Sequence, residues 1–258
     1  MIHPSAQIDT GAELANDVSI GAFSIIGPNV KIASGCQVGS HVVIKGPTEI
    51  GKNTQVFPFC SLGDDPQDKK FDPDSGTSKL IIGENNTIRE YCSINRGTHG
   101  GGGVTRLGND NWIMAYCHIA HDCQVGNNVI FANNATLAGH VEIHDFAILG
   151  GFTGVHQFCR MGENSFSAIS AVVVKDVPPF VIVDGNTARA RAINREGLRR
   201  RGFDKETISA VKEAFKVVYK KGHALNEAIE LLSNSTHSAL QVKQFVEFIK
   251  TSQRGIVR

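Results

Sequence analysis

The fold is decided by a stretch that repeats every six residues, IGAFSI IGPNVK IASGCQ VGSHVV (residues 20–43). Stepping by six from this stretch in both directions gives an aliphatic residue at every step over residues 2–62. The period resumes over residues 82–94 and 107–161, Ser167 interrupts it, and Val173 is its last member. Because only 41% of the chain is hydrophobic, so long a run is a structural repeat and not chance.

A period of six fits neither the 3.6 of a helix nor the 2 of a strand, but it fits a short strand followed by a turn. Glycine follows the aliphatic position ten times and supplies turn conformations that other residues resist. Three sides are the fewest that close a coil around a core, so three hexads, or about 18 residues, should make one turn. The sequence therefore predicts parallel strands stacked at about 4.8 Å, as a parallel β-helix.

All six cysteines fall on the fifth position of a hexad, which is otherwise filled by small residues: Cys36, Cys60, Cys92, Cys117, Cys123 and Cys159. We expect them to point inward as small apolar side chains. They lack the CxxC clustering of zinc sites, so we expect neither a disulfide framework nor a metal.

The composition changes where the repeat ends. Residues 1–185 carry 11 basic and 18 acidic side chains, whereas residues 186–258 carry 15 and 7. Amphipathic patterns predict helices at 204–221, 224–232 and up to 252, with Ser235 or Thr236 capping the last. We therefore predict a β-helix domain at 1–185 and a basic α-helical bundle at 186–258, whose charge suits an anionic partner.

No stretch approaches the ~20 apolar residues of a membrane span, and the first residues lack the regions of a signal peptide. We expect a soluble cytoplasmic protein with no integral membrane segment and no nucleic-acid partner.

Two insertions interrupt the repeat, a polar one at residues 63–76 and a glycine-rich one at 97–103. Insertions in a solenoid emerge as loops on one face and commonly carry function. The glycine run lacks the following helix of a phosphate loop, which leaves a mobile lid or a packing loop.

Histidines gather between residues 99 and 156. With a coil of 18 residues, three successive coils bring one group to the same edge: His121, Gly139, His140, His156 and Gln157. Imidazoles beside Asp122 suit a base with a pKa near neutrality. They also suit zinc, as in the γ-class carbonic anhydrases that share the β-helix. The basic tail favours the base, because a small-gas hydratase has no evident need for it.

The [ILV]-Gly-x-x-[small]-x pattern resembles the hexapeptide-repeat acyltransferases, whose fold is a left-handed parallel β-helix. The hand comes from this resemblance, because the usual preference for right-handed crossovers argues the other way. Four motifs make the resemblance more specific: IAHDC (119–123), NNATLAGH (133–140), VHQF (155–158) and EGLRRRGF (196–203). They look like the acyl-[acyl-carrier-protein]–UDP-N-acetylglucosamine O-acyltransferases, the family that starts lipid A synthesis.

This resemblance implies transfer of a 3-hydroxyacyl group from acyl carrier protein to the 3-position of UDP-N-acetylglucosamine. It also implies a homotrimer with sites between subunits, and no cofactor. His121 would be the general base, Asp122 its orienting partner and Gly139 the oxyanion donor. Other hexapeptide acyltransferases use a CoA donor, and this alternative stays open beside the hydratase. A non-catalytic scaffold would not need three histidines in register.

The resemblance implies further contacts to the substrates. Three residues of the first insertion would hold the sugar nucleotide: Gln67, Asp68 and Lys70. Three would line the acceptor and acyl site: His140, His156 and Gln157. Five would hold the nucleotide and its diphosphate: His118, Asn194, Glu196, Arg200 and Arg201. Ile169 stands where long-chain members of the family have glycine, so we expect the acyl groove to be shorter. Asn95 stands where the family often has histidine.

Overall fold

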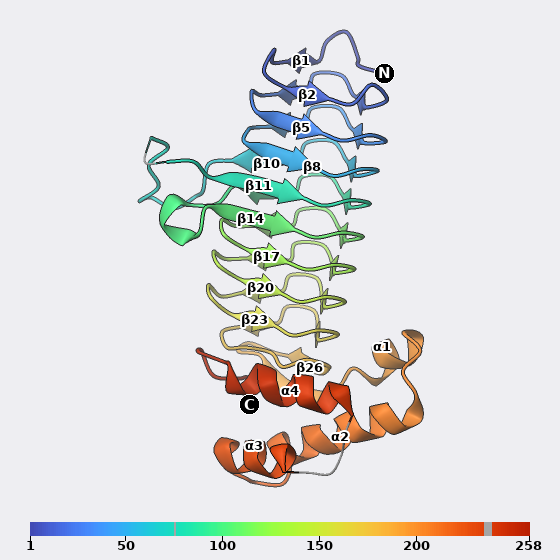
Figure 1. The fold of residues 1–258 in the computed structure, drawn as a ribbon, viewed down its shortest axis with the longest axis vertical. Helices are drawn as coiled ribbons and strands as arrows, with labels where there is room; N and C mark the ends of the chain where they lie inside the picture. Colours follow the sequence, from blue (N-terminus) through green and yellow to red (C-terminus); the bar gives the residue numbers. More distant parts are fainter. Residues whose placement is uncertain (75, 235–238) are drawn as a thin grey trace.

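The hexads wind into a coil with three sides, and each side contributes strands to one sheet (Figure 1). The computed structural model describes residues 1–74, 76–234 and 239–258. The registers confirm the predicted coil length, because Gln7 pairs with Ile25 and Ile130 pairs with Ile148. The two insertions lengthen single coils, so Ser61 pairs with Ser93, and Ser93 pairs with His118.

Three sheets run the length of the β-helix, and in its coils all strand pairs are parallel. Sheet 1 contains β1 (Gln7–Ile8), β4 (Ile25–Ile26), β7 (Val43–Ile44), β10 (Ser61–Asp64), β13 (Ser93–Asn95), β16 (His118–Ile119), β19 (Thr136–Leu137), β22 (Gly154–Val155) and β25 (Val172–Val173). Sheet 2, which faces the reader in Figure 1, contains β2 (Glu13–Leu14), β5 (Val30–Ile32), β8 (Thr48–Ile50), β11 (Lys79–Ile82), β14 (Val104–Leu107), β17 (Gln124–Val125), β20 (Glu142–Ile143) and β23 (Arg160–Met161). Sheet 3 contains β3 (Ser19–Ile20), β6 (Gln37–Val38), β9 (Gln55–Val56), β12 (Thr87–Ile88), β15 (Trp112–Ile113), β18 (Ile130–Phe131), β21 (Ile148–Leu149), β24 (Phe166–Ser167), β26 (Val181–Asp184) and β27 (Arg189–Ile193).

The core is the column of hexad positions that the repeat predicts. From Ile20 onward each of these side chains is at most 5% exposed, and each buried aliphatic one contributes about 1.5–3 kcal/mol. Ser167, which interrupts the pattern, is buried too, and its hydroxyl lies 2.9 Å from the Thr153 hydroxyl, so neither group is left without a partner. All six cysteines are buried, as predicted, and burial raises the pKa of the Cys123 thiol to about 12.

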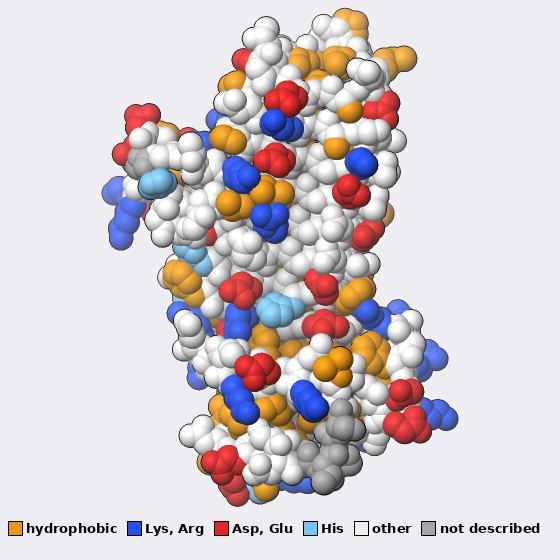
Figure 2. Space-filling model, in the orientation of Figure 1, with side chains coloured by type: hydrophobic (Ala, Val, Ile, Leu, Met, Phe, Trp, Pro, Cys, Tyr) orange, Lys and Arg blue, Asp and Glu red, His pale blue; other side chains and the backbone are white. Residues whose placement is uncertain are grey.

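The outward faces differ in charge. Along sheet 2 the outward column carries charges of both signs, interrupted only by Ile81 and Gln124: Glu13, Lys31, Glu49, Arg106, Glu142 and Arg160. Figure 2 shows acidic (red) and basic (blue) side chains spread over the face that sheet 2 presents in this view. The matching column of sheet 3 carries no Asp, Glu, Lys or Arg and ends in apolar residues: Ser19, Gln37, Gln55, Thr87, Trp112, Ile130, Ile148, Phe166 and Ile182.

The turns between sheets also stack, and we call them edge 1–2, edge 2–3 and edge 3–1 after the sheets that they join. Edge 3–1 carries a ladder of exposed or half-exposed rings whose centroids lie 4.8–5.2 Å apart: Phe23, His41, Phe59, Tyr91 and Tyr116. Both insertions emerge from edge 1–2, because each joins a strand of sheet 1 to a strand of sheet 2, and they project to the left in Figure 1.

The helices follow β27, which pairs antiparallel with β26 and so extends sheet 3 to Ile193. They are α1 (Arg195–Arg200), α2 (Lys205–Tyr219), α3 (Leu225–Ser233) and α4 (Leu240–Lys250). Asp204 caps α2 as its sequence indicates, by accepting from the Thr207 N–H at 2.6 Å. The short α1 was not predicted, and the predicted caps Ser235 and Thr236 lie outside the described residues. The division of the chain at residue 185 stays a prediction.

The helical region is tied back to the β-helix by hydrogen bonds to a buried ion pair of the β-helix, Arg160 with Asp176. The buried Asp176 carboxylate accepts from Nε of Arg160 at 3.0 Å and from the Ser252 hydroxyl at 2.8 Å. Arg160 also donates to the Phe248 carbonyl at the end of α4. Among the helices of the described residues, none combines the length and apolar character needed to cross a membrane.

The buried sulfurs lead to a labelling prediction. In the folded protein a thiol reagent should modify none of the six cysteines on the time scale of minutes, because each is buried and burial disfavours the reactive thiolate. All six should react in strong denaturant. Lys52→Cys, on an exposed turn, is the positive control and should react at once. Fast modification of any native cysteine would contradict the inward placement.

Candidate active site

Edge 1–2 gathers most of the residues that the sequence singled out. His121 and Asp122 follow β16, Gly139 and His140 follow β19, and Gln157 with its neighbour His156 follows β22. Stacked coils place these turns directly above one another: the His140 N–H donates to the His121 carbonyl at 3.0 Å. The predicted coil register is therefore confirmed at this edge.

The first insertion is held against β13. Arg96 at the end of this strand forms an ion pair with Asp65 at 2.6 Å and places its guanidinium over the Phe71 ring. The buried Asn95 donates from Nδ2 to the Asp65 carbonyl at 2.9 Å, while its Oδ1 has no hydrogen-bond partner in the described part of the chain. Gln67, Asp68 and Lys70 are exposed on this anchored loop and, within the described residues, form no hydrogen bond or ion pair with the histidines.

The second insertion packs onto Asp122. Thr98 donates to this carboxylate from its N–H at 3.0 Å and from its hydroxyl at 2.5 Å. The glycine run that follows makes a single 3-10 turn, η1 (His99–Gly101). Of the two alternatives for this loop, the structure therefore has the packing loop.

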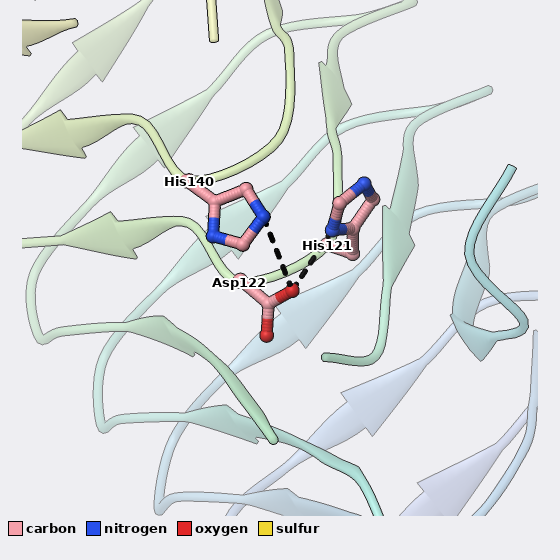
Figure 3. Close-up of side chains that lie close together, drawn as sticks. All are labelled: His121, Asp122 and His140. Atoms are coloured by element: carbon pink, nitrogen blue, oxygen red, sulfur yellow. Dashed lines mark hydrogen bonds and ion pairs between the residues drawn. The ribbon is translucent and has the colours of Figure 1, made fainter. Parts of the chain in front are cut away.

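His121, Asp122 and His140 form the tightest polar cluster of this edge (Figure 3). Nδ1 of His121 lies 2.9 Å from Oδ2 of Asp122, and Nε2 of His140 lies 3.8 Å from the same oxygen. Asp122 is only 4% exposed and accepts from Thr98, so the carboxylate is well supplied with donors. An Nδ1–H that donates to Asp122 leaves Nε2 of His121 with a free lone pair, which is the arrangement of a general base.

Gly139 lies against the ring of His121. A Cβ at this position would be 2.6 Å from Cε1 and 2.7 Å from Nε2 of that imidazole, so only glycine fits. The Gly139 N–H donates to no group in the described residues, which leaves it available to an oxyanion.

The structure adds two residues that the sequence reasoning missed. Phe158 stacks on His140 with ring centroids 4.5 Å apart, and the coil period would have found it, since it follows His140 by one coil. Thr98 holds Asp122 from an insertion, and no repeat signal points to it.

Two further predicted histidines lie outside the cluster. His118 projects from the outer face of sheet 1, where its Nδ1 lies 2.8 Å from the Ser93 hydroxyl, and burial lowers its pKa. His156 is exposed, with Nδ1 3.3 Å from Nη2 of Arg254. Neither forms a hydrogen bond or ion pair with Asp122, so their roles stay predictions.

The residues predicted to hold the nucleotide lie elsewhere on the chain. Asn194 is buried and caps α1 through a bond from the Gly197 N–H, while its Nδ2 donates to the Asn164 carbonyl. Glu196 pairs with Arg199 and Arg200, and these guanidinium groups lower its pKa to about 2.

Arg201 also lies away from the histidine cluster. Its guanidinium covers the Phe146 ring on edge 2–3. One chain therefore does not bring Glu196, Arg200 and Arg201 to the histidines of edge 1–2. Ile169 stands at edge 3–1 and is 71% exposed.

The histidine cluster also has the donor set of a metal site. One ligand atom from each of His121, Asp122 and His140 lies within 4.8 Å of the others. The geometry by itself thus supports both readings of the histidines, zinc and general base.

Comparison with known proteins identifies the family of the chain. Residues 11–46 and 105–139 match the model of the bacterial transferase hexapeptide, and residues 176–257 match that of UDP N-acetylglucosamine O-acyltransferase, domain 2. The acyl-[acyl-carrier-protein]–UDP-N-acetylglucosamine O-acyltransferase of Thiobacillus denitrificans is 54% identical, over 100% of this chain and 99% of that protein. That of Xylella fastidiosa is 53% identical, over 100% and 98%.

Solved structures give the same result. The UDP-N-acetylglucosamine acyltransferase of Francisella novicida is 43% identical with a TM-score of 0.97, covering 100% of this chain and 94% of that one. The corresponding enzyme of Bacteroides fragilis is 35% identical with a TM-score of 0.97, covering 100% of both. The predicted fold, a left-handed parallel β-helix followed by a small helical bundle, is confirmed. The chain belongs to the acyl-[acyl-carrier-protein]–UDP-N-acetylglucosamine O-acyltransferase family.

Proposed function

We propose that this protein transfers a 3-hydroxyacyl group from acyl carrier protein to the 3-hydroxyl of UDP-N-acetylglucosamine, in the cytoplasm, as the first step of lipid A synthesis. The observation that carries the proposal is the His121–Asp122 pair, with Nε2 of the imidazole free beside the Gly139 backbone. Membership of the family supplies the substrates, because the relatives are named for them.

In the reaction, Nε2 of His121 takes the proton of the sugar hydroxyl as its oxygen attacks the thioester carbonyl. Asp122 holds the imidazole through Nδ1 and stabilises the imidazolium that forms. The Gly139 N–H donates to the developing oxyanion. The C–S bond then breaks, the ester C–O bond remains, and the imidazolium returns its proton to the departing thiolate.

The surrounding residues take the binding roles. Gln67, Asp68 and Lys70 stand on a loop anchored beside the same edge and would hold the sugar. His140, fixed by the Phe158 ring and by Asp122, would line the acceptor site with His156 and Gln157. Asn95 gives the loop a hydrogen bond through Nδ2, and this fits a positioning role where relatives often have histidine.

A threefold assembly would unite the two halves of the site. Sheets 1 and 3 present outward columns without charged Asp, Glu, Lys or Arg residues, and the aromatic ladder stands at the edge between them. If three copies meet along edge 3–1, sheet 1 of one copy packs on sheet 3 of the next. Edge 1–2 of one copy then reaches edge 2–3 of its neighbour, which brings His121 and His118 toward the partner's Glu196, Arg200 and Arg201.

The charge of the helical region fits the acyl donor. Carrier protein is strongly acidic, and residues 186–258 carry 15 basic against 7 acidic side chains. No observation on the described residues favours a CoA donor over the carrier.

Removing the base should abolish most of the activity. His121→Ala should lower kcat by roughly 10² to 10⁴, because the hydroxyl then attacks without proton transfer. Acyl transfer from carrier protein to UDP-N-acetylglucosamine, followed with a labelled acyl chain, measures the effect.

The control is His144→Ala, which removes an imidazole that directly follows β20, outside the cluster, and should leave kcat unchanged. Wild-type activity should also survive chelators. Loss to a chelator with recovery in zinc would instead establish the metal reading of the histidines.

The shared site should allow two inactive variants to complement each other. His121→Ala and Arg201→Ala alter different edges, so a mixed trimer contains sites in which both wild-type residues meet. Mixing them at equal amounts through unfolding and refolding should restore about a quarter of the wild-type activity at low sugar nucleotide.

Arg200→Ala mixed with Arg201→Ala is the matched control and should restore nothing, because both changes fall on the same half-site. Light scattering should give three times 27.8 kDa for each variant. Full activity in a monomer would contradict the shared site.

Ile169 should set the acyl length. In the proposed trimer, a groove between sheet 1 and the partner's sheet 3 would lead inward to edge 3–1, where this side chain is 71% exposed in the single chain. Ile169→Gly should shift the preference toward longer 3-hydroxyacyl donors, since each methylene readmitted to an apolar groove contributes about 0.8 kcal/mol. Competition between donors of graded length measures it. If wild type and variant preferred the same donor length, a residue other than Ile169 would limit the length of the acyl chain.

A further inference from the structure

A pocket of about 380 Å³ opens beside the histidine cluster, between the second insertion and the end of the chain. Asp122, His140 and Phe158 line it from edge 1–2, and Gln253 and Arg254 line it from the segment after α4. The pocket therefore connects the proposed reaction centre to a C-terminal arginine that no step of the mechanism uses.

The segment that carries Arg254 is held firmly against the β-helix. The Asp176 N–H donates to the Gly255 carbonyl at 2.9 Å, and the Val257 N–H donates back to the Asp176 carbonyl at 2.9 Å. The Ser252 hydroxyl donates to the Asp176 carboxylate. Backbone pairing just after Arg254 and the Ser252 hydroxyl just before it thus fix where its side chain begins.

Arg254 is the cation of this pocket without an acidic partner. Arg160, the other arginine in the lining, is paired with Asp176 at 3.0 Å. The acidic groups of the lining have partners as well, because Asp122 accepts from Thr98 and Glu142 lies 3.8 Å from His144. Within the described residues, Arg254 has no carboxylate at ion-pair distance, and its guanidinium lies 3.3 Å from Nδ1 of His156.

We propose that Arg254 binds a phosphate group of a substrate at the mouth of this pocket. The proposal rests on the proposed function, which supplies two phosphate-bearing substrates. A guanidinium presents a planar fork of N–H donors that matches two phosphate oxygens, and its charge strengthens both bonds. His156, beside Arg254, adds a ring nitrogen to the same spot.

The position of Arg254 favours the phosphodiester of the carrier's phosphopantetheine arm. His156, which it contacts, lies two coils beyond the level of His121, or about 10 Å along the β-helix. In the sugar nucleotide the diphosphate is joined to the same ring as the attacking hydroxyl. In the carrier the phosphate lies at the far end of the pantetheine chain from the thioester, which suits the larger separation.

The test is the effect of Arg254→Ala on each substrate. We expect KM for the acyl carrier protein to rise roughly 10-fold to 100-fold, the loss typical of charge-assisted hydrogen bonds, with kcat and KM for the sugar nucleotide nearly unchanged. With excised donors, the variant should be impaired toward acyl-4′-phosphopantetheine and match wild type toward acyl-pantetheine, which lacks the phosphate. Arg254→Lys should recover part of the loss.

Lys250→Ala is the matched control, because it removes one positive charge from the nearby end of α4. If both alanine variants raise KM for the carrier equally, Arg254 contributes only to the general field and the proposal is wrong. If KM rises for the sugar nucleotide alone, Arg254 still binds a phosphate group. The group is then the diphosphate of the sugar nucleotide and not the phosphodiester of the pantetheine arm. If KM changes for neither substrate, the proposal fails.

Binding measurements separate this proposal from the proposed function. Calorimetry with 4′-phosphopantetheine and with pantetheine needs no catalysis, and wild type should bind the first more tightly while Arg254→Ala should not distinguish them. If wild type bound 4′-phosphopantetheine and pantetheine equally well, the proposed role of Arg254 would be wrong. A wild-type protein that transfers no acyl group would defeat the proposed function instead.

Discussion

The stacking of coils with a constant register is the constraint on which the rest of the structure depends. Each strand of the β-helix pairs with residues one coil away, so a residue's place in the hexad decides whether it is in the core, on a face or at an edge. A shift of one residue would bury the charged column of sheet 2 and expose the aliphatic column. The insertions leave the register of the later coils unchanged, and the one irregularity lies at the start of the first insertion, between Leu62 and Asp64 of β10.

The same register builds the candidate active site from turns. His121, Gly139 and Gln157 come from three coils, and none of them would be near another without the stacking. The Asp122 carboxylate then joins the elements, since it accepts from His121 and from Thr98 of the second insertion. Burial of that carboxylate requires these donors, because an unpaired charge at 4% exposure would be costly. The packing of the second insertion and the orientation of His121 therefore depend on the same carboxylate.

The distribution of charge among the three faces indicates which faces are suited to association with other copies of the chain. Sheet 2 carries the charge, whereas sheets 1 and 3 present uncharged columns that meet at the aromatic ladder. In the proposed function the site is divided between edge 1–2 and edge 2–3, and one β-helix holds those two edges apart. The proposed association along the uncharged faces would bring them together without burying the ion pairs of sheet 2.

The sequence by itself determined the hexad period, the coil of 18 residues, the inward cysteines and the edge that His121 shares with Gly139, because all of these follow from the spacing of residues along one repeat. The hand of the coil came from resemblance, since spacing is the same for either hand. Only the tertiary structure decided that Thr98 donates to Asp122, that Asn194 caps α1, and that Arg254 lines the pocket beside the histidines. Such contacts join segments with no common period, so their geometry depends on how loops and helices pack and not on any interval in the sequence.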